Sequence, residues 1–208
     1  MNAPILQDSA RIPLPAVAEM TPEQRRIYDK VVTGPRGRMI GPLRAAIQSP
    51  ELAGLWSDLG EFLRFRTCLP ARLNELAIIT AGRRWAAQIE WWVHARSAIE
   101  VGLPKSVVEH IRALTPPVFD ERADYEVYEF SRELQTTGHV SDATHAAVMR
   151  RWGARGVVEL TAVIGYYTMV AMTLNAHRIP VPEAHAPLPE TGSLAELPSA
   201  RLSDGVNA

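Results

Sequence analysis

Hydrophobic residues recur along this chain at spacings of three and four, in runs that proline and glycine separate. Strict alternation of apolar and polar residues, which marks a half-buried strand, is rare. Signals for helix starts are frequent. Thr21-Pro22-Glu23 combines an N-cap residue, a proline at the first helical position and an acid in the first turn, and Ser49-Pro50-Glu51 repeats the arrangement. The pattern therefore predicts an all-α protein.

The same signals set the bounds of the predicted helices. Gly82 closes the fourth helix, and Gly102 followed by Pro104 closes the fifth. Thr115-Pro116-Pro117 is predicted to be a linker. The predicted helices cover residues 22–32, 42–48, 50–64, 70–82, 86–101, 105–114, 120–135, 141–152 and 156–175.

A chain of 208 residues is long enough to bury a sizeable core without disulfides or metals. After Pro180 the helical pattern gives way to proline, alanine, serine and glutamate. Such a composition is typical of an extended or disordered segment. We therefore predict one helical domain over residues 1–180 and an extended or disordered tail over residues 181–208.

The net charge and the absence of targeting signals limit which partners the protein is expected to bind and in which cellular compartment it is expected to lie. The 22 basic and 23 acidic residues leave a formal charge of −1, so we expect neither nucleic acid nor an anionic membrane as a partner, and any anion must be bound locally. Residues 1–20 carry no basic region followed by an apolar one, which predicts no signal peptide. The longest apolar stretch, residues 160–174, falls short of the ~20 residues that span a bilayer. The prediction is a soluble, cytoplasmic protein.

Cys68 is the single cysteine of the chain. One cysteine excludes an internal disulfide and any Cys-x-x-Cys redox or zinc motif, which fits a reducing cytosol. No histidine is close to it in sequence. We interpret Cys68 as a small buried hydrophobe rather than a nucleophile.

The candidate chemistry lies in the run Gln88 to His94, with Glu75 upstream. Glu90 and His94 are four residues apart, so their side chains share one face of a helix. We expect a neighbouring carboxylate, Glu75 or Glu90, to raise the pKa of His94 and keep a proton available on it at neutral pH. The structural alternative is a core histidine that bonds Glu75 across a helical hairpin.

Glu90 is a candidate acid or base because it lies between Ile89 and Trp91 on a largely apolar helix. Burial of an unpaired carboxylate is costly, and it would raise the pKa of Glu90. The alternative is a solvated salt bridge to Arg83 or Arg84.

Candidate substrate-binding residues flank this pair. Arg83 precedes Glu90 by seven residues, so it shares the same face if the helix reaches back that far, and it could then bind a substrate carboxylate bidentately. Trp91 is the candidate aromatic contact for a substrate, and the alternative is that it packs in the core. Arg36 and Arg38, in a Gly/Pro loop, are a second candidate for anion capture, against the alternative of a solvated loop.

A faint internal repeat leaves two explanations open. Glu75 and His94 flank Gly82, and Glu159 and His177 flank Gly165 at similar spacings. Either a helical hairpin is duplicated or common residues align by chance. Glu90 and His94 alone are too few ligands for a zinc site, so we predict no metal.

The run Leu69 to Ile78, followed by Glu90 to His94 and Gly102-Leu103-Pro104, resembles the carboxymuconolactone decarboxylase and alkylhydroperoxidase D-like family. The resemblance covers mainly residues 69–114. In the peroxidase branch, a glutamate is followed at twelve, fifteen and nineteen residues by two redox cysteines and a histidine. The corresponding residues here are Glu75, Ala87, Glu90 and His94. The decarboxylase branch is more similar, because it has glutamate at the second cysteine position and keeps the histidine.

The resemblance implies an all-α, alkylhydroperoxidase D-like helical bundle, a homo-oligomer (trimer or hexamer), and decarboxylation without a metal or an organic cofactor. The expected activity is that of a carboxy-lyase in aromatic compound catabolism, acting on a small carboxylated lactone or ring-cleavage product. His94 would donate the proton, Glu90 would be its acid/base partner and Glu75 would orient the histidine.

Three alternatives to this activity stay open. An isomerase or hydratase would use the same residues. A non-catalytic helical binding or assembly protein would use Glu75 and His94 structurally, and would have a closed cavity beside Glu90. A cysteine-based peroxidase is the least favoured, because both redox cysteines of that branch are absent.

Overall fold

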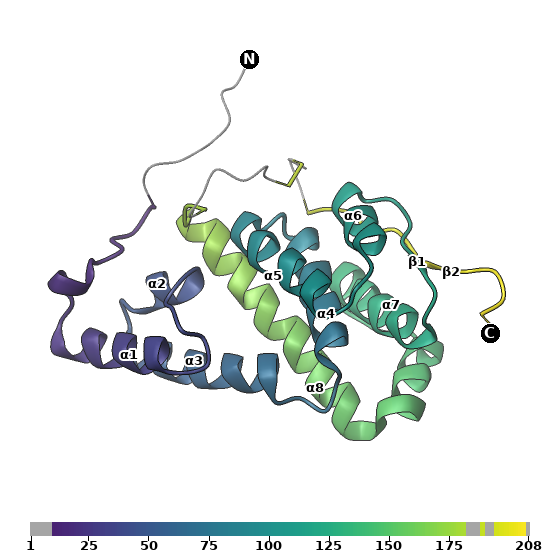
Figure 1. The fold of residues 1–208 in the computed structure, drawn as a ribbon, viewed down its shortest axis with the longest axis horizontal. Coiled ribbons are helices and arrows are strands. Elements are labelled where there is room, and N and C mark those ends of the chain that lie inside the picture. The colour runs from purple at the N-terminus through teal and green to yellow at the C-terminus, as the bar shows by residue number, and fades with distance from the viewer. Residues whose placement is uncertain (1–9, 182–187, 190–193, 207–208) are drawn as a thin grey trace, which may run out of the picture.

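The computed structural model describes residues 10–181, 188–189 and 194–206, and its described part is built almost entirely of helices (Figure 1). The helices are the 3₁₀ turn η1 (Val17–Glu19), α1 (Pro22–Thr33), α2 (Pro42–Ala46), α3 (Pro50–Phe65), α4 (Ala71–Arg84), α5 (Gln88–Glu100), α6 (Lys105–Ala113), α7 (Arg122–Thr137) and α8 (Asp142–His177). The predicted all-α class is confirmed, with the helix bounds close to those that proline and glycine predicted.

One predicted boundary is different. The helices predicted at 141–152 and 156–175 are joined in α8, which kinks at Gly153, where φ is +65°. Glu159 and His177 therefore lie on one continuous stretch of helix, about 27 Å apart along its axis at 1.5 Å per residue. They cannot meet across a hairpin, so the second half does not repeat the hairpin geometry of the first.

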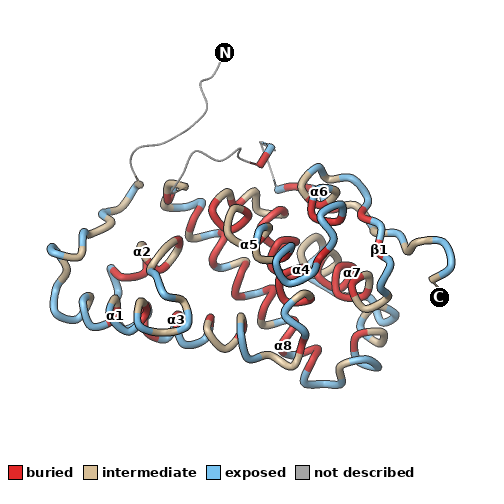
Figure 2. The backbone as a smooth tube through the Cα atoms, viewed as in Figure 1, coloured by how far each residue is buried: buried red, intermediate tan, exposed pale blue. Residues whose placement is uncertain are grey.

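Helix α4 is the centre of the molecule. Its residues 73–83 are all buried, and it packs most extensively against α5, α7 and α8 (Figures 1 and 2). The short helix α2 and the longer α3 lie against α8, and α1 covers α3 from outside. The core therefore forms around the α4–α5 hairpin, which is the segment that carries the candidate chemistry.

By length and composition α8 could cross a membrane, although its apolar stretch looked too short in the sequence. More than half of its most apolar window is buried inside the protein, where α8 packs against α4 and α7. Burial of this kind is found in helices of a protein core.

The described part of the C-terminal tail is an extended arm. Its strand β2 (Arg201–Leu202) pairs in parallel with β1 (Val118–Phe119), the segment that follows the predicted proline linker. Ala195 is bound at both of its backbone groups by Arg84. Residues 194–206 are therefore extended and bonded to the helical part, whereas residues 1–9, 182–187, 190–193 and 207–208 lie outside the described part.

Candidate active site

The α4–α5 hairpin brings Glu75 and His94 together. Ala86 has a φ of +49°, which ends α4 and turns the chain into α5, and the Asn175 amide of α8 donates to the Trp85 carbonyl at 2.7 Å. His94 Nδ1 then lies 2.7 Å from Glu75 Oε2, with both side chains buried. The spacing in the sequence thus becomes a direct acid–imidazole contact between two core helices.

Glu75 is held in its ionised form. Burial by itself would raise its pKa, but His94 and then Arg64, whose Nε lies 3.5 Å from Glu75 Oε1, together lower the pKa below its usual value. Nearby positive and hydrogen-bonding groups favour the charged carboxylate. Glu75 is therefore an acceptor for a proton on His94 Nδ1.

The expected rise in the pKa of His94 is wrong. Its ring is fully enclosed, and loss of solvation lowers its pKa more than Glu75 raises it, with Arg64 and Arg36 adding to the decrease. The imidazole is consequently neutral at neutral pH. Because its Nδ1–H donates to Glu75, Nε2 is the unprotonated nitrogen and can accept a proton.

Glu90 shows the opposite behaviour. It is 2% exposed, and neither carboxyl oxygen has a hydrogen-bond partner among the described residues. Burial and then the nearby charge of Glu75 raise its pKa well above the usual value, which confirms the expected direction. Gly82 of α4 leaves room for this carboxyl, since a Cβ at that position would lie 3.1 Å from Glu90 Oε1. Its surroundings therefore favour the protonated form of Glu90 in the core.

A cavity of about 60 Å³, called here the inner cavity, lies beside Glu90 and His94. Its other polar side chains come from the loop before α2, from α3 and from α8. Its apolar side chains come from that loop and from α2, α5 and α8. The lining residues are Arg36, Ile40, Gly41, Pro42, Leu43, Arg64, Ile89, Glu90, Val93, His94, Tyr166, Tyr167, Val170 and Leu174.

The two tyrosines of α8 form part of the wall of the inner cavity rather than purely apolar core. The Tyr167 ring meets the His94 ring edge to face at 4.9 Å, and Tyr166 donates its hydroxyl hydrogen to the Trp56 carbonyl at 3.2 Å. Burial raises the pKa of Tyr166 to about 12 and raises that of Tyr167 as well. Both phenols are therefore neutral donors. Gly60 of α3 leaves the space that the Tyr166 hydroxyl occupies.

Two of the predicted substrate contacts lie elsewhere. Arg83 belongs to α4, because α5 begins only at Gln88, and its Nε donates to the Arg112 carbonyl at 2.8 Å. Neither Arg83 nor Trp91 lines the inner cavity, and Trp91 is buried in the core. Arg84 binds the C-terminal arm, so the salt bridge to Glu90 weighed as an alternative is not formed.

The arginines of the inner cavity are Arg36, from the second candidate pair, and Arg64. No motif or spacing in the sequence marks Arg64, Tyr166 or Tyr167 as a site residue. The spacing of Arg64, eleven residues before Glu75, carries no helical signal because α3 and α4 are separate helices.

Cys68 lies outside the inner cavity and is half-buried. Its backbone N–H donates to Glu159 Oε2 at 2.5 Å, and burial, followed by Glu159, raises the pKa of its thiol. Glu159 is also paired with Arg155 at 2.7 Å. In the part of the chain that the structure describes, no group of three or more His, Cys, Asp or Glu residues is placed to hold a metal ion.

No family model matches the chain, and no curated protein matches it in sequence. Solved structures do match. An uncharacterised peroxidase-related protein from Silicibacter sp. TM1040 is 14% identical, with a TM-score of 0.67 over 88% of this chain and 97% of that one. A peroxidase-related protein from Ralstonia eutropha JMP134, described as an alkylhydroperoxidase core, is 12% identical, with a TM-score of 0.67 over 85% of this chain and 94% of that one.

A debrominase, solved as a cysteine-to-alanine variant with 2,3,4-tribromopyrrole, is 12% identical, with a TM-score of 0.60 over 78% of this chain and 87% of that one. At these identities the likeness concerns the fold. The chain has the alkylhydroperoxidase D-like helical fold, as its resemblance implied. The fold accommodates an enzyme in at least one neighbour, but a fold alone does not fix a reaction.

Proposed function

We propose that this protein is an acid/base enzyme, and specifically a carboxy-lyase that acts on a small carboxylated lactone or a related product of aromatic ring cleavage. The observation that carries the proposal is Glu90, a buried carboxyl beside the inner cavity whose pKa is raised and whose two oxygens have no hydrogen-bond partner among the described residues. An unpaired buried polar group is costly, and such groups are concentrated where a protein does chemistry.

In the proposed reaction the substrate carboxylate leaves as CO2, and the electron pair of the broken C–C bond moves into an adjacent carbonyl. Glu90 then donates its proton to the carbon, and solvent returns a proton to Glu90. Arg36 and Arg64, which line the same cavity, stabilise the negative charge that develops on the carbonyl oxygen. The proton donor is therefore Glu90 and not, as the sequence suggested, His94.

His94 is the base of the proposed site. Its Nδ1–H is bound by ionised Glu75, which fixes the tautomer and directs the Nε2 lone pair away from Glu75. In a decarboxylase this nitrogen would accept a hydrogen bond from a substrate hydroxyl or from water on the path by which Glu90 is reprotonated. Glu75 acts through His94 and is a positioning residue.

An isomerase or hydratase is the second candidate. The observation that favours it is the combination of a neutral base, His94, and a protonated acid, Glu90, beside one cavity. Moving a proton between two carbons uses both groups as proton carriers, whereas in loss of CO2 the base only binds the substrate or the water that returns a proton to Glu90. Product mass separates the two, because decarboxylation removes CO2 and isomerisation leaves the mass unchanged. The non-catalytic alternative, in which Glu75 and His94 are structural, is disfavoured, because it expects a closed cavity beside Glu90 and the inner cavity lies there.

The test is CO2 release from a set of carboxylated lactones by the wild type and by His94→Gln. Glutamine keeps much of the polar shape but cannot titrate, so we expect turnover to fall by about 10²- to 10⁴-fold. His139→Gln, an exposed histidine outside the inner cavity, is the matched control and should turn over normally. Unchanged turnover in His94→Gln would remove His94 from the mechanism. Absence of CO2 release by the wild type from every lactone would reject the reaction class.

We also propose a homo-oligomer in the cytoplasm. Leu52, Leu55 and Leu59 follow one another on one face of α3 and are 50%, 65% and 49% exposed. An apolar stripe of this kind supports a subunit contact. Sedimentation at several concentrations measures it, and a monomer throughout would reject it.

A further inference from the structure

A second and larger hollow, called here the outer cleft, lies next to the inner cavity. It has a volume of about 570 Å³ and lies between α5, the end of α3 and the loop that precedes α2. Five residues line both hollows, so they share a wall: Arg36, Ile40, Leu43, Arg64 and Val93. A ligand in the outer cleft is therefore next to the proposed acid and base.

The charge of the outer cleft is strongly positive. Of the residues that the structure describes, four with guanidinium groups line it, Arg36, Arg38, Arg64 and Arg96, against a single one with a carboxylate, Glu100. The formal charge of the whole chain is −1, so this concentration is local and cannot be a consequence of a basic composition. Guanidinium groups bind carboxylates and phosphates through parallel hydrogen bonds.

Much of this positive charge is not used inside the protein. Arg96 pairs with Glu100 at 3.1 Å, and Arg64 lies near Glu75 while its Nη2 donates to Ser97 at 3.3 Å. Among the described residues, however, neither Arg36 nor Arg38 forms an ion pair. Arg36 Nε and Nη2 are buried without a well-aligned hydrogen-bond partner, although the Arg36 guanidinium lies near the Tyr166 hydroxyl, a neutral group. Buried donors without partners indicate a missing acceptor.

The sizes of the two hollows constrain the ligand. The inner cavity, at about 60 Å³, is well below the ~300–1,000 Å³ of a usual small-molecule site, whereas the outer cleft is within that range. Only the reacting end of a substrate fits beside Glu90. The rest of the molecule must occupy the outer cleft, among the arginines and beside Phe65 and Trp92.

We propose that the outer cleft binds a polyanionic part of the substrate, with at least two carboxylate or phosphate groups, and that this part directs the reacting end past Arg64 to Glu90. The proposal rests on the proposed function for the identity of the reacting end. It adds that the substrate is larger and more highly charged than a simple monocarboxylated lactone. Arg38 and Arg96 bind the far end of the polyanion, and Arg36 and Arg64 bind the end nearest the inner cavity.

The test is calorimetric titration of the full chain with citrate and, separately, with inorganic pyrophosphate. We expect the wild type to bind one equivalent of at least one probe. Tighter binding of citrate identifies a polycarboxylate, and tighter binding of pyrophosphate identifies a phosphorylated substrate. Arg38→Gln and Arg96→Gln should each weaken binding roughly tenfold or more, the loss expected for a charge-assisted hydrogen bond.

Arg150→Gln is the matched control, because Arg150 is exposed on α8, outside both hollows, and its loss changes the net charge equally. Its affinity should stay within about twofold of the wild type, since a distant exposed charge is largely screened by salt. An equal loss of affinity in all three variants, or no binding of either probe, would overturn the proposal.

The binding test does not depend on turnover, so it separates the two proposals. If the wild type binds a probe in the outer cleft but releases no CO2 from any lactone, the proposed reaction fails and the polyanion site stands. If CO2 is released but Arg38→Gln and Arg96→Gln bind the probes normally, the reaction stands and the polyanion site fails.

Discussion

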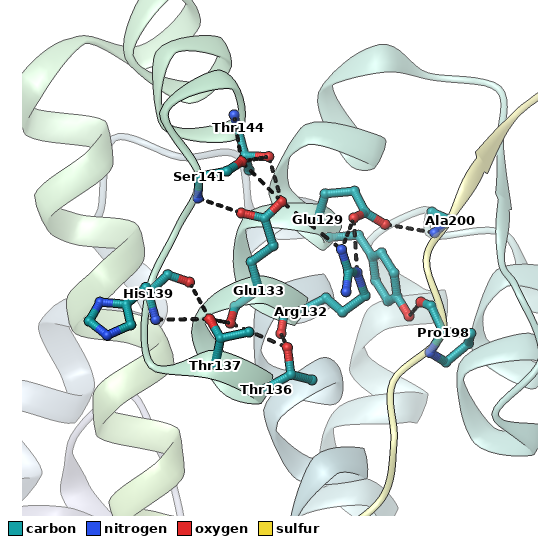
Figure 3. A network of polar contacts seen from close by, with 11 residues as sticks. Glu129, Arg132, Glu133, Thr136, Thr137, His139, Ser141, Thr144, Pro198 and Ala200 are labelled. Carbon is teal, nitrogen blue, oxygen red and sulfur yellow. Dashed lines mark hydrogen bonds and ion pairs between the residues drawn. The ribbon is translucent and has the colours of Figure 1, made fainter.

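Two buried glutamates of this protein have opposite surroundings. Glu90 of α5 and Glu129 of α7 are 2% and 7% exposed. Within the part of the chain that the structure describes, neither oxygen of Glu90 has a hydrogen-bond partner, while both oxygens of Glu129 do. Arg132 donates to Glu129 Oε2 at 2.9 and 2.6 Å, and the Ala200 N–H of the C-terminal arm donates to Oε1 at 2.6 Å (Figure 3).

The surroundings of Glu129 continue into a network that joins three segments. Glu133, one turn further along α7, accepts hydrogen bonds from the Ser141 backbone and the Thr144 hydroxyl at the start of α8. Burial acts to raise the pKa of Glu133, but these bonds lower it below its usual value. The α7 carboxylates therefore connect α7 to α8 and to the arm.

The comparison teaches that burial alone does not mark a functional carboxyl. A buried carboxylate whose hydrogen bonds are complete contributes to the fold, whereas one that is buried without partners beside a cavity is available for proton transfer.

The largest effect should come from Glu90→Gln, which keeps the shape of the protonated acid but removes its proton. We expect CO2 release to fall about 10²- to 10⁴-fold, the usual contribution of general acid catalysis. Glu129→Gln should turn over at a rate near that of the wild type once folded. Steady-state assays of both variants measure the difference, and equal losses would show that the two carboxyls are not distinct.

The free energy of unfolding should show the reverse order. Glu129→Gln weakens charge-assisted bonds to Arg132 in a buried site, so we expect a loss of about 1–3 kcal/mol. Glu90→Gln replaces an already neutral group and should be close to the wild type at mildly acidic pH. Urea denaturation measures both. A strongly destabilised Glu90→Gln would indicate that Glu90 has a structural role after all.

Local patterns in the sequence were sufficient for the helices and for part of the site. The prolines and glycines between helices act within a few residues, which is why most bounds were predicted closely. The spacing of Glu75 and His94 could be used because it spans one hairpin. The continuity of α8 was not predicted, because a glycine at the position of Gly153 indicates the end of a helix. In the structure the helix kinks at Gly153 and continues beyond it.

The other residues of the site come from helices that are distant from the hairpin in sequence. The spacing of residues along the chain does not encode contacts between such helices. Arg64 and Tyr167 enter the inner cavity because α3 and α8 pack beside the hairpin. Arg83 was misplaced because Ala86 turns the chain before α5 begins. The pKa of His94 was assigned in the wrong direction, because the cost of desolvation depends on a burial that no single helix determines.

The raised pKa of Glu90 should make the free energy of unfolding depend on pH. The folded pKa of Glu90 lies above 4.5, so the stability associated with its neutral form is fully present below 4.5 and is lost as pH rises through the folded pKa. The Glu90→Gln variant has no titratable group at this position. Its stability relative to the wild type should increase by about 1.4 kcal/mol for each pH unit between the two pKa values.

Melting curves of the wild type and Glu90→Gln between about pH 3 and about pH 9 measure this difference. Glu133→Gln is the control with the opposite sign, because the pKa of Glu133 is lowered and its contribution is lost as pH falls below 4.5. A difference between the wild type and Glu90→Gln that does not change with pH would mean that Glu90 is ionised in the fold.

The smallest effect should come from Cys68→Ser. Cys68 lies outside the inner cavity and the outer cleft, and burial together with Glu159 raises the pKa of its thiol, so little of the reactive thiolate exists at neutral pH. Both CO2 release and polyanion binding should stay within about twofold of the wild type, as for substitutions away from a site. A peroxide assay of the wild type tests the reverse case. Robust peroxide turnover that disappears only in Cys68→Ser would place the chemistry at Glu159 and Cys68, and would make the unpaired Glu90 a feature of the core rather than of the active site.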